Sequence, residues 1–260
     1  MKKRTIISIL LLSLVFSGCN RQEPPVSVNT TAEQSEHHTD DTENTCTDGV
    51  DICEDFDFSV IAGQVTIDYV LTNDTVICVP DTINGHPVTE LGDSSFYQKA
   101  CVSVHLPATL ESIASGAFYR CYYLEEIVIP SSTEHIGTNP FFRCSSLTDI
   151  YVEPGNGNYC DIDGVLYNAE KTALIAYPEG RTEKSYEIPE DVTTICDDAF
   201  GYYPLVENII IPESVVHFPD YNAFAYLPKI YLTVVAGSAA DRYAKQYGIN
   251  TNLVMPDASN

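Results

Sequence analysis

A repeat of about 23 residues is the feature of this sequence that most restricts its fold. Each copy opens on an apolar residue and a proline, and the step from Pro107 to Pro130 equals that from Pro189 to Pro212. A unit this short cannot bury its apolar side alone, so stacked copies must share one core. A phenylalanine follows each of these prolines, and a longer first copy opens at residue 79, which gives the series Phe96, Phe118, Phe141, Phe200 and Phe224. The sequence therefore predicts a solenoid with five related coils.

The apolar residues within each copy have the spacing of short strands. Ile127 and Ile129 alternate so that both point to one side, and Pro130 follows where a missing N–H matters least. A second short inward segment is expected near Ile113. Phe118 begins a short helical turn, and its ring is expected to fill the core.

These copies resemble the BspA-type leucine-rich repeat of bacterial surface proteins, whose pattern runs L-x-x-I-x-I-P and then V-x-x-I-G-x-x-A-F-x-x-C. The resemblance covers residues 58–250. It implies an α/β, β-rich fold: a curved, right-handed leucine-rich-repeat solenoid with short strands and short helical turns. Members of the family are implicated in adhesion to host or neighbouring-cell proteins, so the resemblance also implies a binding role.

Two segments depart from the repeat. The step from Pro154 to Pro189 grows to 35 residues, and apolar runs at 165–167 and 173–175 flank a turn. This pattern predicts a hairpin inserted in the solenoid wall, and similar insertions occur in the family. Near the C-terminus, Ser238 precedes the stretch 239–247 and Gly248 follows it, which predicts a capping helix. Residues 251–260 are expected to form a tail.

The first 18 residues have the layout of a signal peptide. Basic residues at 2–4 precede an apolar stretch at 6–16, which is too short to span a bilayer, and small residues lead to Cys19. This ending resembles the lipobox of bacterial lipoproteins, which implies a diacylglyceryl anchor on Cys19. The alternative is ordinary secretion with release. The segment 19–57 is then a lipidated cysteine and an acidic, disordered tether, because residues 20–57 hold eleven acids and one base.

The charge of the chain restricts its partners. The formal net charge is −24, and removal of the signal peptide with its three basic residues brings it to about −27. Such a chain repels nucleic acid and anionic lipid. We therefore expect no nucleic-acid partner, and contact with a membrane only through the lipid anchor.

Nine cysteines are present, and one is the predicted lipid site. An exported chain permits disulfides, and Cys46 and Cys53, which bracket a short turn, are the best candidate pair. Sequence alone leaves the connectivity open. Cys101, Cys121 and Cys144 fall at core positions of the coils and are expected to be small buried thiols.

None of the common catalytic or metal-binding patterns occurs in the sequence. It lacks GxSxG, HExxH, the phosphate-binding loop and the EF-hand spacing. None of the six histidines has a second ligand-type residue at metal spacing. We therefore expect no enzyme activity, no cofactor and no metal, although a fold alone does not exclude chemistry.

The strands offer one candidate binding face. In each strand the residue between two inward ones points outward, and coils in register would align these residues as a stripe. Cys78 falls at its start, and the candidate binding residues are His105, Val128, Tyr151, Glu187, Ile210 and Tyr231. Exposed apolar and aromatic groups are typical of binding surfaces, but strand propensity alone also favours valine, isoleucine and tyrosine. A second aromatic set is expected to pack between coils: Tyr97, Tyr119, Phe142 and Tyr202.

The expected function follows from these features. The chain is predicted to be a surface lipoprotein of a bacterial cell membrane, facing outside the cytoplasm, whose solenoid binds an extracellular protein or glycan. One alternative is a structural, envelope-organising lipoprotein without a dedicated ligand. The other is an extracellular hydrolase.

Overall fold

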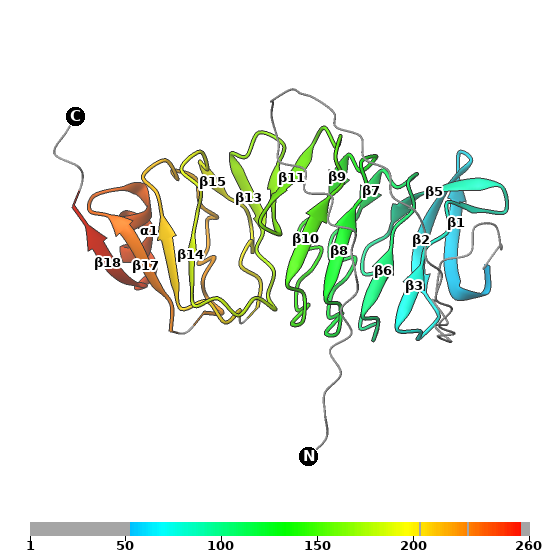
Figure 1. The fold of residues 1–260 in the computed structure, drawn as a ribbon, viewed down its shortest axis with the longest axis horizontal. Coiled ribbons are helices and arrows are strands. Elements are labelled where there is room, and N and C mark those ends of the chain that lie inside the picture. The colour runs from blue at the N-terminus through cyan, green and yellow to red at the C-terminus, as the bar shows by residue number, and fades with distance from the viewer. Residues whose placement is uncertain (1–52, 203, 228, 256–260) are drawn as a thin grey trace, which may run out of the picture. The chain divides into compact units, whose positions relative to one another are not determined.

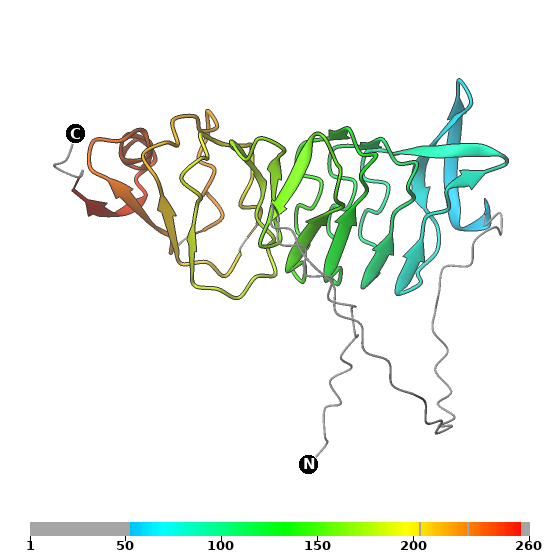
Figure 2. The same ribbon diagram turned by 45° about the horizontal axis from the view of Figure 1, so that its top comes forward.

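The structure is a computed structural model that describes residues 53–202, 204–227 and 229–255. The predicted signal peptide, Cys19, Cys46 and the tether as far as residue 52 lie outside these residues. The described residues belong to one compact unit and form a solenoid of about eight turns. Its coils follow one another in chain order (Figures 1 and 2). The predicted fold class is therefore confirmed.

Short parallel strands form the first wall of the solenoid. Inward residues alternate with outward ones, and Ile127 and Ile129 are buried as their spacing predicts. The wall consists of a pair β3 (Val76–Cys78) and β6 (Ser103–His105), a pair β8 (Glu126–Ile129) and β10 (Asp149–Val152), and the sheet β14 (Ser185–Glu187), β16 (Asn208–Ile211), β17 (Tyr231–Val235) and β18 (Asn250–Val254).

The second wall begins with a hairpin that the repeat does not predict. After a short 3-10 turn, η1 (Cys53–Asp55), the strands β1 and β2 pair antiparallel. The strands β2, β5, β7 and β9 pair parallel in that order, whereas β4 pairs antiparallel with β5. The wall consists of β1 (Phe56–Ile61), β2 (Gln64–Val70), β5 (His86–Leu91), β7 (Ser112–Ile113) and β9 (His135–Ile136), with β4 (Thr82–Ile83) paired to β5.

Hydrogen-bonded turns close the third side of each coil and carry the phenylalanine ladder. The ring centroids of Phe96 and Phe118 are 4.8 Å apart, and those of Phe118 and Phe141 are 5.5 Å apart. The expected short helical turns are absent from this side of the described coils. Arg120 and Arg143 adopt a φ of 65° just after the rings, and a left-handed residue cannot continue a helix.

The inserted segment forms a three-stranded antiparallel sheet, so the predicted hairpin is confirmed and one strand is added to it. The strands are β11 (Tyr159–Ile162), β12 (Val165–Asn168) and β13 (Ala173–Ala176), and β13 pairs parallel with β15 (Thr194–Ile195). Both faces of β12 are buried. Leu166 packs in the core of the N-terminal coils, whereas Val165 and Tyr167 pack in that of the C-terminal coils. The insertion therefore divides the interior into two cores.

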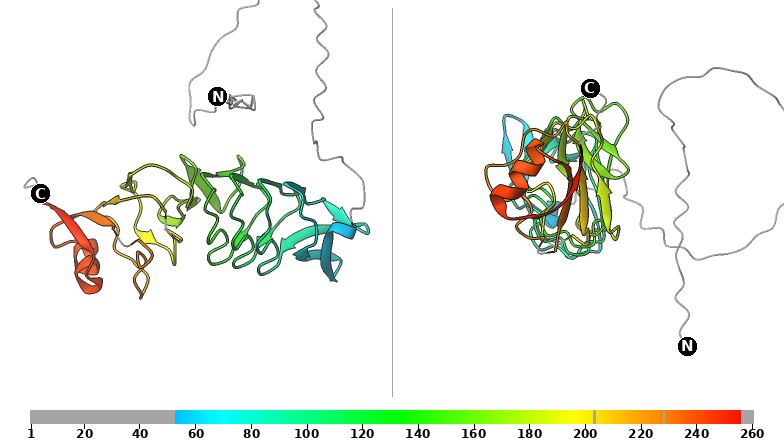
Figure 3. Two further views of the ribbon diagram at one scale, coloured as in Figure 1. Left: turned by 90° about the horizontal axis from the view of Figure 1, so that it is seen from below. Right: turned by 90° about the vertical axis from the view of Figure 1, so that its left-hand side faces the viewer.

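The C-terminal helix is confirmed with the predicted capping residues. In α1 (Ala239–Tyr247), the hydroxyl of Ser238 accepts a hydrogen bond from the backbone N–H of Asp241 at 3.1 Å, and Gly248 ends the helix with a φ of 67°. The helix lies at the end of the coils beside β17 and β18 (Figures 1 and 3). Residues 251–254, which the sequence assigned to a tail, instead belong to β18 and pair with β17.

Candidate binding face

The outward residues of β8 and β10 form a compact group, which we call the β8–β10 patch. Val128 lies directly opposite Tyr151, and Glu126 lies directly opposite Asp149. The side chains of Val128 and Tyr151 keep exposed fractions of 45% and 40%. Their strand neighbours Ile127, Ile129 and Ile150 point into the core, which fixes the orientation of the patch.

The predicted stripe is interrupted. His105 is exposed on β6 and lies opposite Cys78, which is disulfide-bonded. Glu187 lies opposite Ile210 in a separate sheet, because the insertion stands between β10 and β14 in the chain (Figure 1). The structure therefore places the candidate residues in two groups instead of one continuous stripe.

Tyr231 does not share the row of Ile210. It lies opposite Asn208, and Thr233 takes the position opposite Ile210. Around this row the polar side chains bond to one another. The Asn208 amide donates to the Ser185 hydroxyl at 3.0 Å, and the Thr233 hydroxyl donates to Asn208 at 2.8 Å. The C-terminal half of the face therefore contains a hydrogen-bonded polar ladder of Ser185, Asn208 and Thr233 beside Ile210 and the exposed Tyr231.

Carboxylates surround the aromatic ring of the β8–β10 patch. Partial burial is the largest cause that raises the pKa of the Tyr151 hydroxyl, and the negative charges of Asp149, Glu126 and Asp161 raise it further. Arg181 opposes them. Its guanidinium lies 3.9 Å from Asp149 and 3.7 Å from Glu183, so this one cation is already shared between two carboxylates.

The basic residues of the N-terminal coils lie elsewhere. The ammonium of Lys99 is 4.7 Å from the centroid of the Tyr69 ring, and the guanidinium of Arg120 is 5.1 Å from that of Tyr119. The guanidinium of Arg143 is 3.8 Å from the centroid of the Tyr202 ring. All three belong to the turn side of the coils, and β3, β6, β8 and β10 contain no lysine or arginine.

The second aromatic set packs between coils, as predicted. Ring centroids are 5.4 Å apart from Tyr97 to Tyr119, 5.9 Å from Tyr119 to Phe142 and 5.8 Å from Phe142 to Tyr202. These distances lie in the range of favourable ring pairs. The set is therefore part of the packing of the turns.

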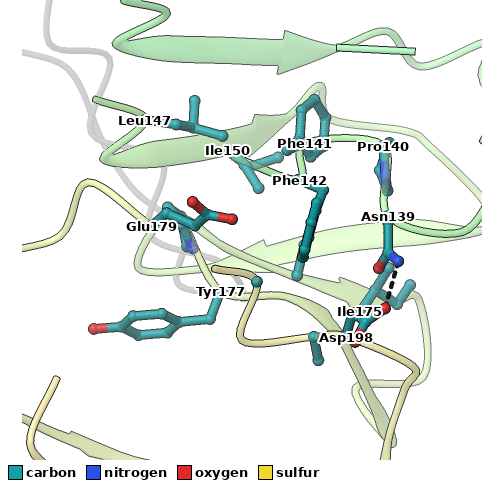
Figure 4. A pocket seen from close by; sticks show the side chains of 14 residues that line it. Asn139, Pro140, Phe141, Phe142, Leu147, Ile150, Ile175, Tyr177, Glu179 and Asp198 are labelled. Atoms are coloured by element: carbon teal, nitrogen blue, oxygen red, sulfur yellow. Dashed lines mark hydrogen bonds between the residues drawn. The ribbon is translucent and has the colours of Figure 1, made fainter. Parts of the chain in front are cut away.

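A small cleft lies between the turn that holds Asn139 and the next turn, which follows the inserted strands and holds Glu179 (Figure 4). Glu179 lies on one side, and on the other the Asn139 amide donates to Asp198 at 2.6 Å. Glu179 is only 6% exposed, and its Oε1 accepts from the backbone N–H groups of Arg143 at 2.8 Å and Tyr202 at 2.7 Å. The cleft leaves about 20 Å³ for the centre of a water molecule, which is room for one ordered water.

Burial governs the electrostatics of this cleft. It raises the pKa of the Glu179 carboxyl to about 7, although the two backbone donors and the charge of Arg143 act in the opposite direction. Glu179 is not among the residues that the sequence predicts for a site. The segment Pro178–Gly180 resembles an ordinary surface turn in sequence, and its glutamate is buried because this turn packs between those that hold Arg143 and Tyr202.

The cysteines of the coils are structural. Cys101, Cys121 and Cys144 are buried free thiols, and Cys121 and Cys144 donate to the carbonyls of Phe96 and Phe118. The described part of the chain brings no three metal-ligating side chains together. The predicted pair of Cys46 and Cys53 stays a prediction, because Cys46 and the side chain of Cys53 lie outside what the structure describes.

Sequence comparison assigns the repeat. The BspA type leucine rich repeat region matches the chain in six copies, over residues 82–169 and 176–235. The chain belongs to this family. The family repeat thus extends through part of the insertion and contains one copy more than the five that the proline spacing predicts. No match was found among curated proteins.

A solved structure agrees with this leucine-rich-repeat fold. A leucine-rich repeat protein from Eubacterium ventriosum shares 21% identity at a TM-score of 0.52, over 71% of this chain and 55% of that protein. The pneumococcal vaccine antigen PcpA shares 18% identity at a TM-score of 0.44, over 69% of this chain and 70% of that one. The chain therefore spans little more than half of the first of these proteins, and the likeness concerns the fold.

Among the helices in the described ranges, none combines the length and the apolar composition needed to cross a bilayer.

Proposed function

We propose that this leucine-rich-repeat chain is a bacterial surface lipoprotein that binds an extracellular protein through the β8–β10 patch. The observation that carries the proposal is the exposure of Val128 and Tyr151 side by side on two paired strands. Exposed tyrosine next to apolar surface is typical of the residues that contribute most to binding. The family, which consists of repeats found in bacterial surface proteins, supports a binding role in place of catalysis.

A double variant tests the patch. The full chain is immobilised, partners are retained from a panel of purified secreted and cell-surface proteins, and their Kd values are measured. We expect Val128→Ala with Tyr151→Ala to weaken saturable binding about tenfold or more, because the substitutions remove the apolar contact area. Tyr231→Ala is the matched control, since that tyrosine is similarly exposed on β17. Equal binding by both variants would remove the patch from the proposal.

We also propose that Cys19 holds the chain on the membrane. The support is the basic, apolar and small-residue order that ends at this cysteine. In bacteria that express the full chain, Cys19→Ala is expected to abolish labelling by a fatty-acid analogue and to shift the protein from the membrane fraction to the medium. Cys160→Ala is the control. Labelling that survives Cys19→Ala would contradict the anchor.

A structural lipoprotein without a dedicated ligand is the second candidate, and the polar ladder of the C-terminal half supports it. In that case the panel yields no saturable partner for the unsubstituted chain.

A further inference from the structure

The β8–β10 patch carries a net negative charge. Glu126 and Asp149 lie directly opposite each other across two paired strands, an arrangement that destabilises a sheet because like charges meet on one face. Asp161 adds a third carboxylate beside β10, where its Oδ1 accepts from the backbone N–H of Val152 at 2.9 Å. Arg181 offsets part of this charge beside Asp149, but its guanidinium is shared with Glu183, so three carboxylates of the patch face one shared cation.

The ring of Tyr151 stands among these carboxylates and is solvent-accessible. An aromatic face attracts a cation, and the attraction adds to that of nearby carboxylates. A guanidinium suits both features, because it stacks on a ring with its plane and donates to carboxylates along its edge. The chain shows this combination once already, since Arg181 contacts Asp149 and lies 5.8 Å from the centroid of the Tyr177 ring.

We propose that the partner of the β8–β10 patch is a basic protein segment that places an arginine over Tyr151, between Glu126 and Asp149. This inference rests on the proposed binding function and names the chemistry of its partner. Charge complementarity supports it: the patch holds carboxylates, and the lysines and arginines of the N-terminal coils are engaged on the turn side. Binding would relieve the repulsion across β8 and β10.

A defined peptide tests the proposal. The probe is a flexible, fluorescent peptide in which arginine alternates with glycine and serine, and its anisotropy is followed with the full chain. The same peptide with citrulline in place of arginine keeps the shape but loses the charge. We expect saturable binding of the arginine peptide only, and binding that weakens as salt rises, because exposed charges are screened over a Debye length of about 10 Å at 0.1 M salt.

Matched variants separate the patch from the charge of the whole chain. Glu126→Gln and Glu213→Gln remove the same charge, and both residues are exposed, but only Glu126 lies in the patch. We expect Glu126→Gln to weaken binding about threefold and Glu213→Gln to leave it unchanged. Tyr151→Phe, which keeps the ring face, should retain binding, whereas Tyr151→Leu should lose about threefold.

Equal losses from Glu126→Gln and Glu213→Gln would overturn the proposal, because they would show attraction by net charge alone. Equal binding by the leucine and phenylalanine variants would remove the ring from the site. A chain that retains a protein partner through Val128 and Tyr151 but ignores the arginine peptide would refute the basic partner and leave the proposed function standing. Failure of both experiments would refute both.

Discussion

Replacing Phe118 with alanine is expected to lower the free energy of unfolding by about 3–5 kcal/mol. Phe118 is fully buried, and its ring lies between those of Phe96 and Phe141 in the ladder of the N-terminal core. The loss combines the transfer free energy of the ring with the cost of the cavity that it leaves. That cavity cannot close easily, because the backbone N–H groups of Phe96 and Phe118 donate to the next coil at 2.8 Å and hold the coil spacing.

Urea unfolding of the full chain, followed by far-ultraviolet circular dichroism, measures this loss. The chain contains no tryptophan, so circular dichroism of the backbone is used in place of tryptophan fluorescence. Tyr123→Ala is the control: that ring is exposed, and its removal is expected to change stability by less than about 0.5 kcal/mol. If the two variants unfolded at the same urea concentration, the phenylalanine ladder would not be a main support of the core.

Periodicity made the coils predictable. A constant step between prolines and an alternating apolar pattern leave few other ways to bury Ile127, Ile129 and Phe118 at once. The capping helix was equally accessible, because Ser238 and Gly248 are local signals that act through their own backbone. The prediction of the coils depends on contacts that recur in every copy of the repeat. The prediction of the helix depends on capping contacts that recur at helix ends.

The position of Tyr231 shows where periodicity fails. Ile230, Leu232 and Val234 alternate along the strand and are all buried. Shifting this strand by two residues against its neighbour keeps every side chain on its own face. Both alignments of the strand therefore bury equally apolar side chains. The sequence prediction aligned Tyr231 with Ile210, whereas the structure aligns Thr233 with it. The strand β18 was missed for a related reason, since four of its five residues are exposed and carry no alternating pattern.

The buried glutamate of the cleft was not predictable from local sequence. In a regular coil the backbone N–H of Arg120 donates to the carbonyl of Phe142 in the next coil. At the insertion the turn of the next coil holds Tyr177 and Glu179, and the Glu179 carboxylate accepts from the backbone N–H groups of Arg143 and Tyr202 instead. A carboxylate thus substitutes for backbone carbonyls at the junction of the two cores, and only the three-dimensional arrangement shows the need for it.

This substitution predicts a pH-dependent stability that Glu179→Gln should remove. The folded chain raises the carboxyl pKa from its ordinary value of 4.5 to about 7, so between these pH values the folded state binds the proton more tightly than the unfolded state. The resulting contribution to stability is complete below about pH 4.5 and is lost as pH rises through about 7. One pKa unit corresponds to about 1.4 kcal/mol, so the loss is about 3 kcal/mol.

Glutamine keeps an amide oxygen for the N–H groups of Arg143 and Tyr202 but stays neutral at every pH. The stability of Glu179→Gln relative to the unsubstituted chain should therefore rise by about 3 kcal/mol between pH 4.5 and pH 8, measured by urea unfolding at each pH. Other carboxyl groups also contribute to the pH dependence, so Glu213→Gln, at an exposed site, serves as the control. Its plot of unfolding free energy against pH should run parallel to that of the unsubstituted chain. Parallel curves for Glu179→Gln as well would show that the carboxyl at the junction is not desolvated. A steeper fall for the unsubstituted chain between about pH 4.5 and pH 7 would show that the two cores are joined most firmly when this carboxyl carries its proton.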